Sequence, residues 1–200
     1  MDTPEEIERE EWYSQIYEEI STEAVLEFSY DRLRSYYLKN PKIAQNAFYT
    51  YLDGIEILSQ HPTAAILLFV TSIEVALKSV LLKPVIYGLV HNESVADLIS
   101  DLAVRNNGLD RFNKILDYIL SEYSGINIQE HRIKGHKVDF LKELKSIQDV
   151  RNGISHRADR ATHETAKLAE EIATEVIYKL VGGVLIGLGF SLEEDGTIST

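Results

Sequence analysis

The chain has 200 residues and a formal net charge of −12, which is enough length for one domain with a substantial hydrophobic core. It contains no cysteine, which excludes disulfides, thiolate metal sites and cysteine nucleophiles. The net negative charge argues against non-specific coating of nucleic acid. The N-terminus, MDTPEEIEREEW, lacks the apolar core of a signal peptide, and the two longest apolar runs contain charged residues. We therefore expect a cytoplasmic protein with no membrane span.

Charge is unevenly distributed along the chain. Residues 1–30 contain ten acidic residues and one arginine, whereas residues 131–160 contain eight lysines or arginines, four acidic residues and three histidines. Both segments are interpreted most simply as solvated helix faces. Alternatively, the basic segment binds a phosphate backbone. A further hypothesis is that the acidic N-terminus mimics nucleic acid and covers the basic segment in autoinhibition.

Apolar residues recur at helical spacing along most of the chain, and strict alternation is rare, which predicts an all-α fold. We expect an acidic extension over residues 1–20, then helices that begin near Ser21 or Thr22 and after Asn40-Pro41. The next helix, roughly 63–82, is apolar on most sides and should be central in a bundle. Lys83-Pro84 should end it.

Shorter elements are expected after this central helix. A helix capped by Asn92 or Ser94 should run through Leu102, with a turn at Asn107-Gly108. RFNKILDYILSEY predicts an amphipathic helix, and SGINIQEHRIKGH predicts a loop.

A long helix should then run from about Val138 to His156, followed by a last helix that Thr162 caps. Gly182-Gly183 should end or loosen this last helix. Together these elements predict an up-and-down bundle of four to five core helices. The bundle should form a single helical domain over residues 21–190, with a C-terminal tail over 191–200.

The segment SIQDVRNGISHRADR, residues 146–160, gathers arginines and a histidine around one glycine. Arg151 and His156 are five residues apart, which places them about 140° apart on an ideal helix, on different faces. Gly153 would bring them to one phosphate by loosening the helix locally. Alternatively, two copies of the segment meet across a two-fold axis. The simplest interpretation is a surface arginine and a histidine near a helix C-terminus.

An arginine and a histidine around one phosphate suit the cleavage of RNA, which carries its own nucleophile, the 2′-OH. A histidine near neutrality accepts that proton or protonates the leaving 5′-oxygen. An arginine binds the phosphate and stabilises the charge of the transition state. Asn152 would orient the histidine or bond a phosphate oxygen, and the reaction needs no metal or other cofactor.

The motif RNGISH resembles the R-N-x-x-x-H motif of HEPN domains, the "higher eukaryotes and prokaryotes nucleotide-binding" helical bundles. The surrounding DVRNGISHRADRATHETAKLAEEIA has the layout of that motif followed by a long last helix. AAILLFVTSIEVALKSVLL resembles the family's earlier central helix, which often contains an acidic residue. The resemblance covers roughly residues 40–190.

This resemblance implies that Arg151 and His156 are the catalytic pair, with Asn152 as the variable polar position and Glu74 as the acid that holds Arg151. It also implies a metal-independent endoribonuclease that acts as a homodimer with a composite site. Such proteins serve as toxins or anti-phage defence effectors, and an antitoxin or regulatory protein is a possible partner. Other members have no activity and only bind nucleotides or protein partners, which is the alternative function.

Some residues have further interpretations. The toxin branch that pairs with a nucleotidyltransferase antitoxin has a modified tyrosine where this chain has Ala158, which argues against control by tyrosine adenylylation. Glu74 lies on an otherwise apolar helix with Lys78 four residues later on the same side, so an ion pair between these two is the alternative to pairing with Arg151. His131 and His136 lack a carboxylate at convincing spacing, so no metal site is predicted. The residues predicted to bind RNA are Arg157, Arg160, Lys145 and Lys137.

Overall fold

The computed structural model describes residues 30–89, 95, 98 and 113–200. The predicted extension over 1–20, the helix start near Ser21, the helix over 92–102 and the turn at Asn107-Gly108 lie outside the described residues. Among those residues, every element is a helix except for one small two-stranded sheet. The prediction of an all-α bundle is therefore confirmed.

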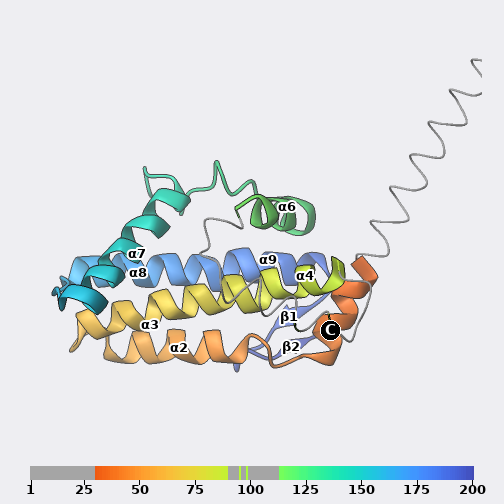
Figure 1. Cartoon of the computed structure of the whole chain (residues 1–200), viewed down its shortest axis with the longest axis horizontal. Coiled ribbons are helices and arrows are strands. Elements are labelled where there is room, and N and C mark those ends of the chain that lie inside the picture. The colour runs from red at the N-terminus through yellow and green to blue at the C-terminus, as the bar shows by residue number, and fades with distance from the viewer. Residues whose placement is uncertain (1–29, 90–94, 96–97, 99–112) are drawn as a thin grey trace, which may run out of the picture.

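Three long helical rods run side by side along the molecule (Figure 1). The first is α2 (Gln45–Ile57). The second is α3 (Pro62–Val75), which continues through the π-helical segment η1 (Ala76–Leu82) into α4 (Lys83–Leu89). The third is α8 (His163–Thr174), which continues through the π-helical segment η3 (Glu175–Val181) into α9 (Gly182–Gly187).

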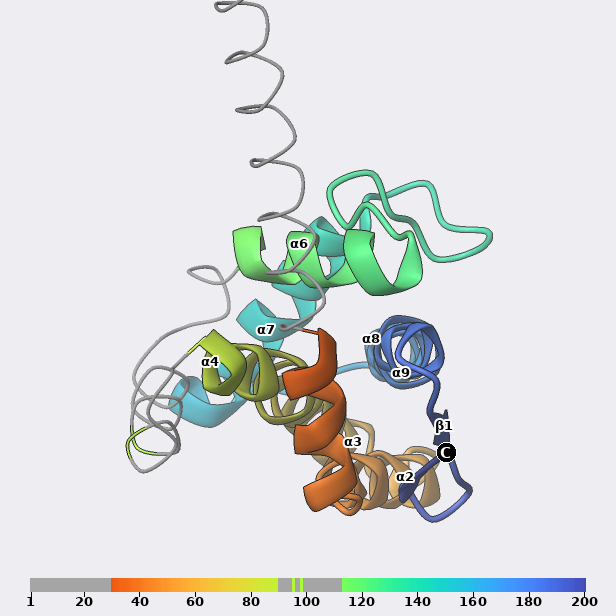
Figure 2. The ribbon, with the colours of Figure 1, turned by 90° about the vertical axis from the view of Figure 1, so that its right-hand side faces the viewer.

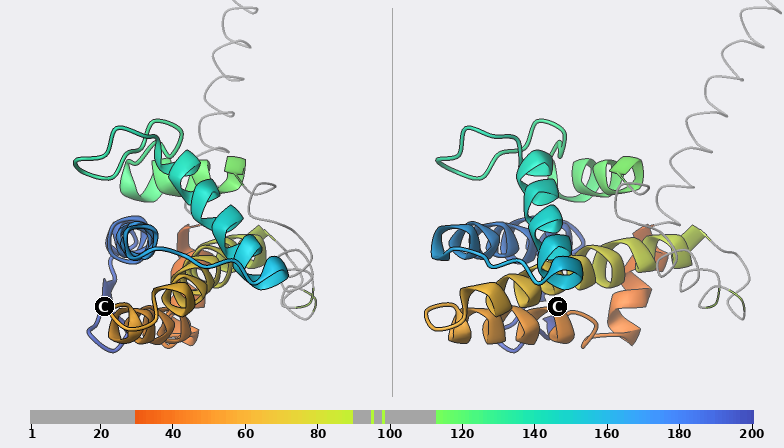
Figure 3. Two further views of the ribbon diagram at one scale, coloured as in Figure 1. Left: turned by 90° about the vertical axis from the view of Figure 1, so that its left-hand side faces the viewer. Right: turned by 60° about the vertical axis from the view of Figure 1, so that its left-hand side comes forward.

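The remaining helices pack against or across these rods. Residues 30–39 form a helix that crosses the rod direction, and α6 (Asn113–Ser124) lies beside α9 (Figure 2). The loop over 125–139 then leads to α7 (Phe140–Arg157), which crosses the central rod obliquely (Figure 3). The loop and the long helix agree with the sequence predictions.

The central rod supplies much of the core, as its apolar sequence predicts. Ile66, Phe69, Val70 and Ile73 are completely buried, because the rod is covered by α2, α8 and α7. The helical stretch Pro62–Gly88 is also long and apolar enough to cross a membrane, and 61% of its most apolar window is buried inside the bundle. A core helix has the same length and composition, so this property is weak evidence for a membrane span.

The expected end of the central helix at Lys83-Pro84 is wrong, because the rod continues through Pro84 into α4. Proline cannot donate a hydrogen bond to the carbonyl four residues earlier, which here is the carbonyl of Val80. That oxygen instead accepts a hydrogen bond of 2.6 Å from the hydroxyl of Tyr37. At the end of η1, the Lys83 amide bonds to Lys78, five residues back. A tertiary partner and a widened helical turn thus accommodate the proline.

Replacing Tyr37 with phenylalanine should lower the free energy of unfolding by about 1–3 kcal/mol, because it leaves the buried Val80 carbonyl without this donor. Burial raises the pKa of the Tyr37 phenol, so the donor proton is kept at alkaline pH. Urea denaturation followed by circular dichroism measures the loss. Tyr49→Phe is the matched control, because Tyr49 is 46% exposed and its substitution should change stability by less than about 0.5 kcal/mol. Equal effects of the two substitutions would contradict this account.

The last rod begins as predicted, since the Thr162 hydroxyl accepts a hydrogen bond of 3.2 Å from the Thr165 amide. It does not end at Gly182-Gly183, where the π-helical segment gives way to α9. The glycines of α9 allow α6 to approach closely. A Cβ atom on Gly183 would lie 3.0 Å from that of Ser124, and one on Gly187 would lie 2.8 Å from the carbonyl carbon of Tyr123.

Residues 191–200, expected to be a tail, contain an antiparallel hairpin that packs on the bundle. Strand β1 (Ser191–Leu192) pairs with β2 (Ile198–Ser199) in the register Leu192 to Ile198. Ile198 is 4% exposed, and its amide donates a hydrogen bond of 2.7 Å to the Pro41 carbonyl. Pro41 itself lies in a turn before α2 rather than in the first turn of that helix. The hairpin therefore covers the start of α2.

Candidate functional site

Helix α7 carries the R-N-x-x-x-H motif in its last two turns. Its buried side chains Phe140, Leu144 and Ile147 follow the spacing of one helix face and fix that face on the core. The helix ends at Arg157, and the capping residue Ala158 has a left-handed backbone with φ of 56°. The core contact thus determines which way the motif residues point.

Arg151 is held by two neighbours. Its guanidinium donates to a carboxylate oxygen of Glu74 on α3 at 3.3 Å and to the amide oxygen of Asn152 at 3.1 Å. The side chains of Arg151 and Glu74 are 32% and 30% exposed, so the pair lies at the rim of the core. Glu74 thus contacts Arg151, and no ion pair joins it to Lys78 in the part of the chain that the structure describes.

His156 lies in the last turn of α7 and is exposed. Within residues 30–89 and 113–200, no hydrogen bond or ion pair involves its ring. Helix α7 is continuous from Phe140 to Arg157, so Gly153 does not loosen it. Because the helix is regular, Arg151 and His156 stay about 140° apart around its axis, and one chain presents them on different faces.

Gly153 lies beneath the side chains of Arg157 and Asp159. A Cβ atom there would lie 2.5 Å from a carboxylate oxygen of Asp159 and 2.6 Å from a guanidinium nitrogen of Arg157. These two residues form an ion pair of 2.7 Å that folds back over the helix end. Because both side chains are exposed at 68% and 48%, a Cβ atom at this position would displace their ion pair and leave the backbone of the turn in place.

The four residues predicted to bind RNA lie within α7 or just beyond its two ends. Arg157 pairs with Asp159, and Lys145 pairs with Asp149 at 3.3 Å. Arg160 and Lys137 are exposed, and neither forms an ion pair among the described residues. Helix α7 has 18 residues and so spans about 27 Å. Lys137 precedes its start and Arg160 follows its end, so the four cations do not converge on one point.

The histidines of the loop over 125–139 contact glutamates, which sequence reasoning missed. His131 contacts Glu175 through Nε2 at 2.8 Å. His136 contacts Glu143 through Nδ1 at 3.0 Å and Glu171 through Nε2 at 3.4 Å. His136 lies in the loop before α7, so its spacing from Glu143 gave no helical signal. Glu171 and Glu175 are far away in sequence, and only the fold brings them close.

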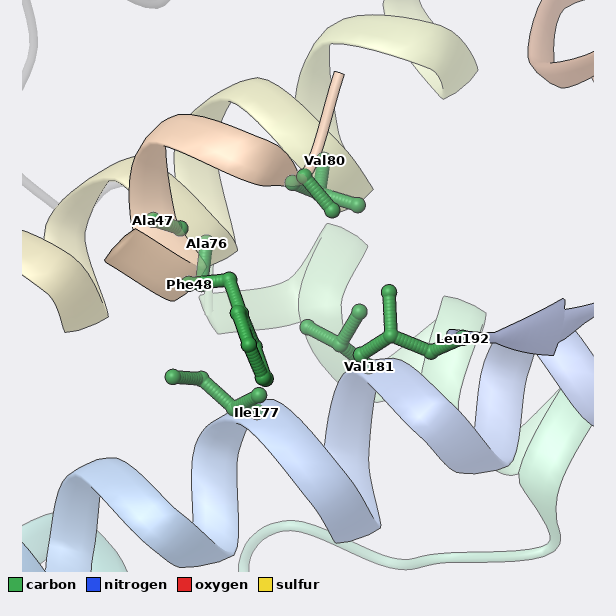
Figure 4. A pocket seen from close by; sticks show the side chains of 8 residues that line it. Ala47, Phe48, Ala76, Val80, Ile177, Val181 and Leu192 are labelled. Carbon is green, nitrogen blue, oxygen red and sulfur yellow. The ribbon is translucent and has the colours of Figure 1, made fainter. Parts of the chain in front are cut away.

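No group of three or more histidine, aspartate and glutamate side chains in the described part of the chain could hold a metal ion. A small cavity of about 10 Å³ lies between α2, η1, η3 and β1 (Figure 4). Its lining is entirely apolar and includes Phe48, Val80, Ile177 and Leu192. A cavity of this size is at the lower limit for one water molecule. We therefore regard it as a packing gap and not as a ligand site.

The arrangement offers an anchored guanidinium and a free imidazole on one helix. The guanidinium retains N–H groups for an anion, because Arg has five donors and two contacts here. The imidazole has no competing partner among the described residues and is open to a ligand. The chain matches no protein-family model, and no curated protein or solved structure shows significant similarity to it.

Proposed function

We propose that this chain is a metal-independent endoribonuclease of the HEPN type, with a composite site built from two copies of α7. The observation that carries the proposal is the contrast between the two motif residues. Arg151 is oriented by Glu74 and Asn152, whereas the ring of His156 is exposed. A phosphate-binding group should be preorganised, and a proton-transfer group must reach the substrate.

The helix geometry favours a second copy. Since Arg151 and His156 lie about 140° apart on a regular helix, the imidazole of one chain would meet the guanidinium of its partner across a two-fold axis. Residues near the end of α7, such as Arg160, would then bind the RNA backbone. Homodimerisation is thus part of the proposal.

In the proposed reaction, the neutral His156 imidazole accepts the proton of a ribose 2′-OH. The 2′-oxygen then attacks the adjacent phosphorus, and the bond to the 5′-oxygen breaks. A protonated imidazole or a water molecule supplies the proton that the leaving 5′-oxygen needs. The products are a 2′,3′-cyclic phosphate and a 5′-hydroxyl. Arg151 stabilises the negative charge that develops on the phosphate.

The test is RNA cleavage by the purified full chain in EDTA, with His156→Ala beside the wild type. The wild type should cut and His156→Ala should not. His163→Ala is the matched control, because His163 is also exposed and begins the next helix, α8, and its loss should leave cleavage unchanged. Equal cleavage by the wild type and His156→Ala, or no cleavage of any RNA tested, would contradict the proposal.

A non-catalytic binding module of the same fold is the second candidate. The observation that favours it is the separation of Arg151 and His156 on two faces of one continuous helix. Such a module would bind a nucleotide or a protein partner without cleaving RNA. Tight binding that survives Arg151→Ala, together with no nuclease activity, would support it over the ribonuclease. Only the ribonuclease proposal includes a role as a toxin or defence effector that a regulatory partner protein controls.

A further inference from the structure

The loop over 125–139 is attached to the helices through two histidines that differ in how many ring nitrogens they use. His131 contacts Glu175 through Nε2 alone, and its side chain is 9% exposed. A neutral imidazole with its proton on Nε2 still donates this hydrogen bond. Loss of the ring's second proton therefore leaves the contact in place. His131 anchors one part of the loop in both protonation states.

His136 is different, because both of its ring nitrogens face carboxylates. Nδ1 lies 3.0 Å from each oxygen of Glu143 on α7, and Nε2 lies 3.4 Å from Glu171 on α8. A neutral imidazole has one N–H, so one of its nitrogens would direct a lone pair at a carboxylate oxygen. The Nδ1 contact is a hydrogen bond, and the Nε2 contact is an ion pair, which needs the positive charge of the imidazolium form. His136 therefore bridges α7 and α8 only when it is protonated.

The two glutamates also differ. The side chain of Glu143 is 10% exposed, whereas that of Glu171 is 45% exposed. A buried carboxylate without a partner costs more than an exposed one. The neutral ring should thus keep its proton on Nδ1, where it donates to Glu143. The contact of Nε2 with Glu171 is lost, and water solvates the exposed Glu171 carboxylate instead.

We propose that His136 is a proton-dependent staple, which links the loop to α8 at acidic pH and releases that link as the pH rises. This inference is independent of the proposed nuclease. The charged groups around the staple are Glu143 on α7 and Glu171 on α8. Beyond these, Lys167 on α8 interacts electrostatically with Glu171, and Glu175 is shared between His131 and Lys179. The loop's own Lys134 and Lys137 are exposed.

Ring nitrogen NMR shifts and amide hydrogen exchange of the full chain test the staple at an acidic pH of about 5.5 and an alkaline pH of about 8.5. Both nitrogens of His136 should be protonated at the lower pH, and only Nδ1 at the higher. The amide of His136, which donates to the Ile133 carbonyl at 2.9 Å, should exchange several-fold faster at the higher pH after correction for intrinsic chemistry. Amides in α3 should not change.

Two variants separate the staple from a general effect of pH. Glu171→Gln offers both a donor and an acceptor to the ring, so the link between His136 and α8 should persist at both pH values. His136→Gln has no titrating group and should show similar loop exchange at both. His163→Gln, an exposed histidine on α8, should behave as the wild type.

Three results would overturn the proposal. They are a neutral His136 ring at the lower pH, a proton on Nε2 at the higher pH, and equal loop protection at both values in the wild type. If His136→Gln fails to fold, as circular dichroism would show, the wild-type ring shifts and Glu171→Gln still decide the question.

Discussion

Dimers that combine one Arg151→Ala chain with one His156→Ala chain should recover about half of the wild-type RNA cleavage if the site is shared between subunits. Homodimers of either variant should lose on the order of 100-fold or more, the usual cost of removing a general acid–base group or a group that stabilises the transition state. In the mixed dimer, one site receives both alanines. The other receives the intact arginine of one chain and the intact histidine of its partner.

The measurement uses two chains with different affinity tags, purified in sequence so that only mixed dimers remain. Mixed dimers of wild type with the double variant Arg151→Ala, His156→Ala are the control. Each site of this control lacks one group, so it should stay near background. If each site lies within one chain, the opposite result is expected. The control dimer then keeps one complete site and cleaves RNA, whereas the dimer of Arg151→Ala with His156→Ala has no complete site. A monomer that cleaves RNA would also contradict the shared site.

Replacing Gly187 with alanine should lower the free energy of unfolding by about 2–3 kcal/mol, because overpacking at a backbone contact forces two helices apart. A Cβ atom on Gly187 would overlap the carbonyl oxygen of Tyr123 and lie 3.3 Å from its Cα. These are backbone atoms of α6, so no rotation of a side chain relieves the overlap. The contact between α6 and α9 must open instead.

Gly182→Ala is the matched control for Gly187→Ala, since both glycines belong to α9. The nearest atom to a Cβ on Gly182 is the Ile177 carbonyl oxygen at 3.7 Å, an ordinary contact. Alanine there should raise stability by about 0.5–1 kcal/mol through its better helix propensity. Urea denaturation of both variants gives the comparison. If Gly182→Ala lowers the free energy of unfolding by as much as Gly187→Ala, the close contact with α6 is not the cause of the loss at Gly187.

Predictions that depend only on neighbouring residues were confirmed, whereas a predicted helix end that a distant residue affects was wrong. The central helix, the long α7 and the Thr162 cap agree with the structure, because apolar periodicity and capping depend on neighbours within a few residues. The expected break at Lys83-Pro84 is wrong. A proline inside a helix leaves one carbonyl without its usual amide donor. Here the hydroxyl of Tyr37, far away in sequence, donates to that carbonyl, which belongs to Val80, so the helix continues.

In the candidate site, too, the sequence predicts the local geometry and the fold determines the distant partners. The motif residues Arg151 and His156 and their separation of about 140° follow from spacing on a helix. The sequence left two candidate partners for Glu74, Lys78 and Arg151. Because α7 crosses α3, Glu74 pairs with Arg151. The glutamates that hold His131 and His136 were not predicted, since two of the three are on the last rod.

By itself, the sequence determined the helical fold class, the apolar central helix and the position of the R-N-x-x-x-H motif near the end of a helix. Helical periodicity is a local property, and the sequence contains the information on it. The tertiary structure alone decided which glycines permit close packing, which donor serves the Val80 carbonyl and which carboxylates meet Arg151, His131 and His136. These depend on contacts between residues distant in sequence, and the crossing angles of packed helices determine them.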